Sequence, residues 1–128
     1  MAVYTKIDKK DIVLINDQFE IEKIIHFEGI KKGIENTNYL LKTNKNKYIL
    51  TIFEKRVSKK EIPFFMKLME ILNNSNINCP KPLKNKNGSH LIKLKSKKAC
   101  IVSFLDGKDK IQLNLKNCYE VGKVIANI

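Results

Sequence analysis

Two stretches of this chain combine residue types that could hold a nucleotide. The first is the glycine-bearing run Gly33-Ile34-Glu35-Asn36-Thr37-Asn38, which lies between two segments that we expect to be β-strands. Glycine lets the backbone approach an anion closely, and exposed N–H groups of a loop can then bind phosphate oxygens. A loop of this kind could cover phosphates. The same residues are also typical of an ordinary turn between strands.

The second stretch is the apolar run from Ala99 to Leu105, which ends at Asp106-Gly107. A strand that ends at a flexible connector can present backbone N–H and C=O groups to a flat heterocycle. The alternative interpretation is a core strand that ends in a turn.

The cysteines and histidines do not suggest metal chemistry. Cys79, Cys100 and Cys118 are spaced 21 and 18 residues apart without a CxxC pair, and only His26 and His90 could join them. A structural zinc site needs four clustered ligands, and an odd number of cysteines argues against a disulfide framework. We therefore expect no metal site of cysteines and histidines, and interpret the cysteines as small buried hydrophobic residues.

The net charge of +12 is carried almost entirely by lysine, since Arg56 is the one arginine in the chain. The segment from Lys81 to Lys98 holds seven lysines and no acidic residue. Proteins that read base edges favour arginine, because its planar guanidinium makes bidentate contacts. We therefore interpret this segment as a solvated hairpin. A nucleic-acid-binding module that attracts phosphates through these lysines is the alternative.

Hydrophobic periodicity predicts an α+β fold, a five-stranded antiparallel sheet with one helix inserted after the third strand. The expected strands lie at 21–30, 37–43, 47–53, 89–95 and 99–105. In the second strand, Tyr39 and Leu41 should share one face and Leu40 the other. Turns are predicted at 44–46, at Asn87-Gly88 and at 96–98.

Three helices are predicted around these strands. The first runs from Asp8 to about Asp17, with Asp8 as its cap and Ile12 and Ile15 facing inward. The second begins at Ser58, because Ser58 and Glu61 have the spacing of a capping box. Its inner face is predicted to contain Phe64, Phe65, Leu68, Met69 and Leu72. The third helix begins near Asn114.

The length of 128 residues fits a single core, and no apolar run approaches the roughly 18 residues that a membrane-spanning helix needs. The N-terminus has charges inside its apolar stretch and no small-residue cleavage site, which is unlike a secretory signal. A soluble cytoplasmic protein is therefore expected.

Several segments, taken together and in this order, make the chain resemble a known family. They are Met1–Thr5, Gly33–Leu41, Lys47–Arg56, Pro63–Phe65 with Leu68–Glu70, Cys79–Pro82 and Ile101–Gly107. The chain is similar to the homoserine kinases that belong to the aminoglycoside-phosphotransferase and choline-kinase-like superfamily. The resemblance covers essentially all 128 residues.

The resemblance implies a protein-kinase-like fold of two lobes. Residues 1–105 would form the N-terminal, ATP-binding lobe, and residues 106–128 the connector and the first helix of a truncated C-terminal lobe. The implied ATP-binding residues are Gly33, Glu35, Asn36, Thr37, Asn38, Thr51, Ser103, Phe104 and Leu105. Members of the family transfer the γ-phosphate of ATP, with Mg²⁺, to the hydroxyl of L-homoserine in threonine biosynthesis. Neither nucleic acid nor a membrane is an implied partner.

The chain departs from the related kinases at one position that matters for phosphate binding. Their third strand carries a lysine that holds the α- and β-phosphates, whereas this chain has Thr51 there, with Lys55 and Arg56 further on. A threonine cannot supply that charge. The helix glutamate that pairs with the lysine would be Glu61 or Glu70, but neither aligns cleanly, and the capping box alone explains Glu61.

The family's catalytic loop and its metal-binding aspartate are expected beyond residue 128. Phosphoryl transfer depends on such a base and on metal ligands, and Asp106 and Asp109 lie in the connector, where they are poor candidates. We therefore expect no catalytic residue in this chain, and interpret it as a fragment that is inactive in phosphoryl transfer when alone. A related small-molecule kinase with another acceptor is the alternative within the same class.

Overall fold

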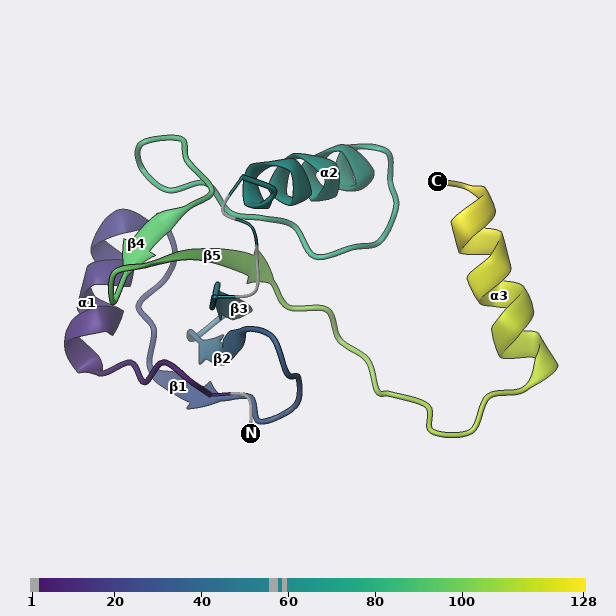
Figure 1. Ribbon diagram of the computed structural model, residues 1–128, viewed down its shortest axis with the longest axis horizontal. Coiled ribbons are helices and arrows are strands. Elements are labelled where there is room, and N and C mark those ends of the chain that lie inside the picture. The colour runs from purple at the N-terminus through teal and green to yellow at the C-terminus, as the bar shows by residue number, and fades with distance from the viewer. Residues whose placement is uncertain (1–2, 56–57, 59) are drawn as a thin grey trace.

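The computed structural model describes residues 3–55, 58 and 60–128, and its elements confirm the predicted α+β fold (Figure 1). The elements in chain order are α1 Lys9–Gln18, β1 His26–Gly29, β2 Thr37–Lys42, β3 Lys47–Ile52, α2 Ile62–Asn74, β4 Ile92–Leu94, β5 Lys97–Ser103 and α3 Leu115–Ala126. The strands form one sheet of order β1-β2-β3-β5-β4, and all neighbours are antiparallel. Met1, Ala2 and Arg56, which contribute to the family resemblance, lie outside the described residues.

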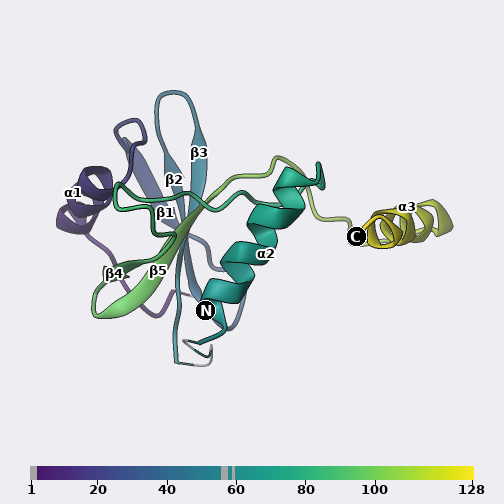
Figure 2. The same cartoon turned by 90° about the horizontal axis from the view of Figure 1, so that it is seen from above.

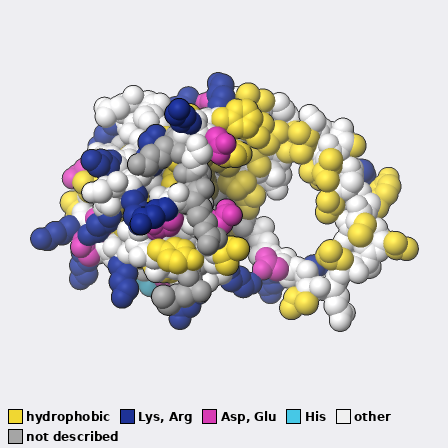
Figure 3. Space-filling model, in the orientation of Figure 1, with side chains coloured by type: hydrophobic (Ala, Val, Ile, Leu, Met, Phe, Trp, Pro, Cys, Tyr) yellow, Lys and Arg dark blue, Asp and Glu magenta, His cyan; other side chains and the backbone are white. Residues whose placement is uncertain are grey.

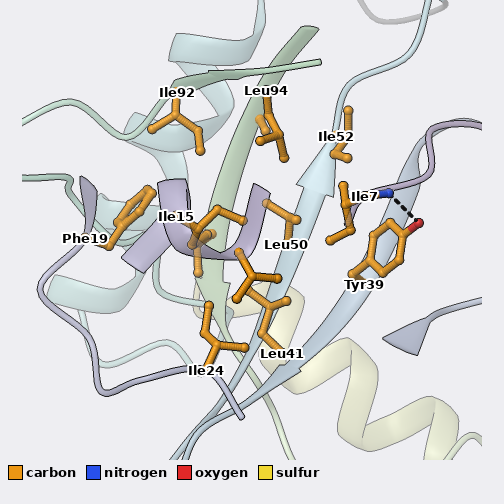
Figure 4. Close-up of a cluster of buried hydrophobic side chains, with 13 residues drawn as sticks. Ile7, Ile15, Phe19, Ile24, Tyr39, Leu41, Leu50, Ile52, Ile92 and Leu94 are labelled. Carbon is orange, nitrogen blue, oxygen red and sulfur yellow. Dashed lines mark hydrogen bonds between the residues drawn. The ribbon is translucent and has the colours of Figure 1, made fainter. Parts of the chain in front are cut away.

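Helix α1 covers one face of the sheet and closes the larger core. Asp8 caps the helix by accepting from the N–H groups of Lys10 and Asp11, and the Asp11 carboxylate accepts in return from the Asp8 N–H. Ile12 and Ile15 are buried, as predicted. They pack with alternate residues of the strands, and the cluster is shown in Figure 4. The residues of this cluster that are fully buried include Leu41, Leu50, Ile52 and Ile101.

Helix α2 lies against the opposite face, as the view from above shows (Figure 2). Its buried residues are Ile62 and Met66, which pack with Cys100 and Val102 of β5. This second core is smaller than the first. The face next to α2 is therefore only partly covered by apolar side chains of the described residues.

The second helix starts later than the sequence pattern predicted, and its predicted inner face is right only in part, since Met69 packs against the core. Glu61 is the N-cap residue but makes no side-chain capping bond, so the capping box from Ser58 is wrong, and Lys59 lies outside the described residues. Proline lacks an N–H and is tolerated in the first helical turn, which places Pro63 there. Phe64, Phe65 and Leu68 are exposed, because the four-residue spacing from Ile62 to Met66 fixes which side faces the sheet.

Two further boundaries differ from the sequence prediction. The first strand covers only His26–Gly29, because the preceding segment is held by helix α1, where the Asn16 side chain bonds the Glu22 carbonyl and the Ile24 N–H. The turn between β4 and β5 lies at Lys95-Ser96 rather than at 96–98. Both residues have positive φ (48° and 64°), which is the geometry of a two-residue hairpin turn.

The turn at 44–46 forms without the left-handed backbone that its residues tolerate. The Thr43 hydroxyl accepts hydrogen bonds from the N–H groups of Lys45 and Asn46, and the Thr43 N–H donates to the Asn46 carbonyl. The side chain of Thr43, the residue just before the predicted turn, thus holds the turn in place.

Helix α3 stands apart from the sheet at the end of an extended connector (Figures 1 and 2). Asn114 caps it, as predicted, and exchanges hydrogen bonds with Asn117. Apolar side chains gather over α2 and along α3 (Figure 3). In the part of the chain that the structure describes, no helix is long and apolar enough to cross a membrane.

Candidate functional site

The glycine-bearing loop connects β1 to β2 and covers residues 30–36. Its base is closed by the Ile30 N–H, which donates to the Asn38 carbonyl at 2.8 Å. Gly33 has a φ of 106°, a conformation that side-chain-bearing residues rarely adopt, so the loop needs glycine there. Gly33 and Glu35 are exposed and Asn36 is half-buried. The loop is therefore accessible to a ligand at its tip.

Thr37 ends the loop and is fully buried. Its hydroxyl accepts from the N–H groups of Tyr4 (2.9 Å) and Thr5 (3.1 Å) and donates to Glu54 Oε1 (2.7 Å). The Tyr4 hydroxyl donates to the Ile34 carbonyl at 3.0 Å. Thr37 is thus occupied by the protein itself, and its role is to hold the end of the loop.

Glu54, which directly follows Phe53 after β3, also bonds Lys97 through an ion pair. Partial burial raises the pKa of the Glu54 carboxyl, but hydrogen bonds from Lys97, Thr5 and Thr37 outweigh burial and hold this pKa below its ordinary value. The carboxyl group is therefore ionised at neutral pH. Glu54 is not among the site residues predicted from the sequence, although a glutamate directly after an apolar strand was a usable signal.

Thr51 and Asn38 form a polar pair in the middle of the sheet. They are cross-strand partners, and the Thr51 hydroxyl donates to Asn38 Oδ1 at 2.8 Å. Thr51 alternates with the core residues Leu50 and Ile52, so it faces α2 rather than α1. The structure thus places two of the predicted site residues side by side on the less covered face.

Glu61, the N-cap residue of α2, and Glu70 within α2 were the candidate partners of a β3 lysine, and neither forms that ion pair. Glu70 bonds Lys84 (2.8 Å) and Lys67 (3.3 Å), and these hydrogen bonds lower its pKa below the ordinary value. Glu61 is exposed at the start of the helix. The expected lysine position on β3 is occupied by Thr51, so this position offers neither glutamate a cationic partner.

Ser103, Phe104 and Leu105 form the end of β5 and the start of the connector. Ser103 bonds Lys81, donating from its N–H to the Lys81 carbonyl and accepting at Oγ from the Lys81 N–H, both at 2.9 Å. The Phe104 N–H donates to the Lys47 carbonyl (3.3 Å), and Lys47 Nζ lies 5.4 Å from the centre of the Phe104 ring. A cavity of about 340 Å³ opens here against the turn between β2 and β3.

Backbone groups of this connector remain available to a ligand. Among the described residues, neither the Phe104 carbonyl nor the Asp106 N–H makes a hydrogen bond. In an extended chain, the carbonyl of one residue and the N–H of the second residue after it point to the same side. The connector therefore offers an acceptor and a donor that one flat heterocycle could bind together.

The loop and the connector lie at opposite ends of β3. Thr37 pairs with Ile52 at one end, and Ser103 pairs with Tyr48 at the other. At about 3.4 Å per residue, the four steps from Tyr48 to Ile52 span about 14 Å. An extended ligand with a heterocycle at one end and phosphates at the other matches this separation.

The lysine-rich segment 81–98 does not present all its charges to solvent. Lys84 pairs with Glu70, Lys95 pairs with Asp8 and Asp11, and Lys97 pairs with Glu54. Several of the lysines that suggested phosphate attraction are thus engaged in ion pairs.

In the described ranges, no group of three or more His, Cys, Asp and Glu side chains is placed to hold a metal ion.

Comparisons with known proteins identify the family of this chain. The family model of the phosphotransferase enzyme family matches residues 26–128. The chain belongs to this family. Among curated relatives, the phosphotransferase chain is 38% identical over 128 residues to "Homoserine kinase" of Gluconobacter oxydans and 40% identical over 128 residues to "Homoserine kinase" of Paramagnetospirillum magneticum. Each match covers the whole chain but only 40% and 39% of the relative.

Solved structures confirm the fold of this phosphotransferase chain. It matches spectinomycin phosphotransferase in complex with ADP and spectinomycin with a TM-score of 0.76 at 18% identity, covering 97% of this chain and 38% of that one. The AMP-bound complex of the same enzyme matches with a TM-score of 0.67 at 19% identity, covering 94% and 36%. The predicted protein-kinase-like N-terminal lobe and the predicted family resemblance are both confirmed.

Proposed function

We propose that this chain is the nucleotide-binding part of a homoserine kinase, which transfers the γ-phosphate of ATP to the hydroxyl of L-homoserine. The observation that carries the proposal is the similarity, at 38–40% identity along the chain, to relatives named homoserine kinase. The chain spans about 40% of their length. In this proposal, residues 1–105 are the ATP-binding lobe, residues 106–128 begin the second lobe, and the protein works in the cytoplasm in threonine biosynthesis.

In the proposed complex, ATP lies along the face of the sheet next to α2. The adenine would meet the connector after Ser103, where the Phe104 carbonyl accepts from its amino group and the Asp106 N–H donates to a ring nitrogen. Phe104 and Leu105 would also supply apolar contact. The phosphates would extend past Thr51 and Asn38 toward the loop 30–36. The connector and the loop are separated by about 14 Å along β3, and this separation supports the proposed orientation of ATP.

At the loop, backbone groups would make the phosphate contacts. Gly33 permits close approach, and Glu35 and Asn36 lie in the accessible part of the loop, whereas Thr37 is fully buried and holds the end of the loop in place. Thr51 supplies a hydroxyl where related kinases have a lysine. The affinity of this chain for the phosphates therefore rests on hydrogen bonds more than on a fixed cation.

The mechanism assigned to these residues is to bind and orient ATP. Catalysis of phosphoryl transfer depends mainly on positioning and on stabilising charge, with magnesium neutralising the phosphate oxygens when it is bound. The described residues do not offer a carboxylate cluster that fits such an ion. We propose that the magnesium ligands, the catalytic base and the acceptor site belong to the part of the homoserine kinases that this chain does not span.

Titration of the purified chain with a fluorescent ADP analogue, with unlabelled nucleotides as competitors, tests this proposal. ATP is expected to compete at least about tenfold better than inosine triphosphate, because the latter has an acceptor where adenine has its amino donor. The chain alone should not phosphorylate homoserine. Absence of nucleotide binding, or equal competition by ATP and inosine triphosphate, would contradict the proposed site.

A further inference from the structure

Four side chains from four separate segments meet behind the loop 30–36. Thr5 comes from the N-terminal segment, Thr37 from the start of β2, Glu54 from the residues after β3, and Lys97 from the start of β5. Thr37 is fully buried, Thr5 is 8% exposed and the side chain of Glu54 is 11% exposed. A carboxylate with so little access to water lowers the stability of the fold unless hydrogen-bond donors and a positive charge surround it.

Both carboxylate oxygens and both threonine hydroxyls of this cluster have hydrogen-bond partners. Glu54 Oε1 accepts from the hydroxyls of Thr5 (2.6 Å) and Thr37 (2.7 Å), and Oε2 accepts from Lys97. Lys97 also donates to the Thr5 hydroxyl at 2.7 Å. A threonine hydroxyl has one donor and two acceptor positions, and the Thr37 hydroxyl uses all three. Each group therefore has one orientation that satisfies its neighbours.

The cluster is connected to the loop at several points. The Glu54 N–H donates to Asn36 Oδ1 at 3.3 Å, and the Tyr4 hydroxyl donates to the Ile34 carbonyl at 3.0 Å. Gly29 at the start of the loop lies against the N-terminal segment, since a Cβ there would come within 2.8 Å of the Val3 side chain. The N-terminal segment and the loop therefore lie side by side, near the N-terminus in Figure 1.

Both carboxylate oxygens of Glu54 are occupied by Thr5, Thr37 and Lys97, so the carboxylate is held by the protein itself. Side chains of a strand alternate between the faces, so Glu54 continues the side of Ile52, in the core closed by α1. Thr51 and Phe53 belong to the other side. The contacts of Glu54 connect it to nucleotide binding through the position of the loop.

From this geometry we infer that Glu54 is a positioning residue, which holds the loop 30–36 in the conformation that binds the phosphates. The inference rests on the proposed function, because it assumes that the loop covers a nucleotide. Glu54→Gln keeps one oxygen that can accept from the two hydroxyls, but it places an NH₂ group, which cannot accept, opposite the Lys97 ammonium. The loop then loses its fixed support while the apolar core stays in place.

The chain offers a matched control for the loss of a little-exposed ion pair. The Asp11 side chain is 12% exposed and pairs with Lys95, another lysine of the hairpin that carries Lys97. Asp11 belongs to the N-terminal turn of α1 and makes no bond to the loop. Glu54→Gln and Asp11→Asn therefore remove comparable ion pairs, of which only one supports the loop.

Hydrogen exchange measured by mass spectrometry, together with titration of the fluorescent ADP analogue, tests the inference on both variants. In Glu54→Gln, amides of residues 30–36 should exchange at least about tenfold faster, and ADP affinity should fall by about tenfold. In Asp11→Asn, exchange should increase around α1, and ADP affinity should change less than about twofold. Thr37→Val, which removes the hydroxyl that donates to Glu54, should resemble Glu54→Gln.

The two readouts separate failure of the inference from failure of the proposed function. Unchanged exchange of 30–36 in Glu54→Gln, or equal loss of ADP affinity in Asp11→Asn, would overturn the positioning role. If the wild-type chain binds no nucleotide while loop exchange still responds to Glu54→Gln alone, the support of the loop stands and the proposed function fails.

Discussion

The two faces of the sheet differ in how completely they are covered. On the face against α1, Leu41, Leu50 and Ile101 have no exposed surface and belong to one continuous apolar cluster. On the face against α2, the buried cluster is small, and the polar pair of Thr51 and Asn38 lies beside it. Because both faces are made by the same strands, the difference lies in alternate residues of one sequence.

This difference assigns stability mainly to one face and ligand binding mainly to the other. Apolar burial stabilises by about 25 cal/mol per Å², so the face with the larger closed cluster contributes more. A face with half-buried polar groups contributes less to folding, but it leaves hydrogen-bonding groups accessible. The predictions that follow test whether the two roles are as separate as the structure indicates.

The largest expected effect comes from two neighbouring leucines of β2 that face opposite ways. Leu41 is fully buried against α1, whereas Leu40 is half-buried on the other face. Leu41→Ala should lower the free energy of unfolding by about 3 kcal/mol, within the range for core leucines. Leu40→Ala should lower it by about 1 kcal/mol or less. Urea denaturation of the two variants measures the difference, and equal destabilisation would remove the contrast between the faces.

The second prediction concerns nucleotide affinity and uses Thr51. Thr51→Lys should raise the affinity for ATP relative to AMP by about tenfold, because a cation at this position faces the proposed path of the phosphates. The fold should be retained, since Thr51 is only half-buried and a lysine stem can lie along the apolar surface. Competition titrations measure the ratio of the two affinities.

Thr51→Val is the control for that substitution, because it removes the hydrogen bond to Asn38 without adding charge. It should leave the ATP-to-AMP ratio close to that of the wild type. If Thr51→Lys does not change this ratio, the phosphates do not pass over the middle of β3. An equal rise in AMP affinity would likewise contradict the proposed orientation.

The third prediction uses the acid dependence of folding. The pKa of Glu54 is lowered in the folded chain, so its contribution to stability is present above the unfolded pKa of a glutamate, about 4.3, and is lost as the pH falls through the folded pKa. Urea midpoints measured from pH 7 down to pH 3 should therefore converge for wild type and Glu54→Gln as the pH falls. A constant difference across this range would show that the charge of Glu54 is not what stabilises the cluster.

The sequence predicted the framework of the fold because its signals are local. The cap of α1 at Asp8, the inward Ile12 and Ile15, and the alternation of Tyr39 and Leu41 all follow from spacing within one element. The start of α2 was wrong because a capping-box pattern at Ser58 competes with the requirement that Pro63 lie in the first turn. Local patterns give no rule for which of the two prevails.

The candidate site was predicted only in part, because its supports join residues that are distant in sequence. The residue types of the loop and connector pointed to Gly33 and Phe104, although their contacts with a nucleotide remain a prediction. The cluster of Thr5, Glu54 and Lys97 joins positions up to 92 residues apart. No spacing rule connects such positions, and only the folded sheet brings them together.

The smallest expected effect concerns an exposed ion pair between the two ends of the proposed site. Lys32 in the loop pairs with Asp109 in the connector at 2.8 Å, and both side chains are at least 80% exposed. The pair raises the pKa of Lys32 and lowers that of Asp109, through a hydrogen bond and their mutual attraction. Exposed pairs are screened by solvent and salt, so Asp109→Asn should leave the urea midpoint unchanged within error. If the urea midpoint falls by as much as in Leu40→Ala, the ion pair between Lys32 and Asp109 would hold the loop and the connector together. The loop would then depend on a second support besides the cluster around Glu54.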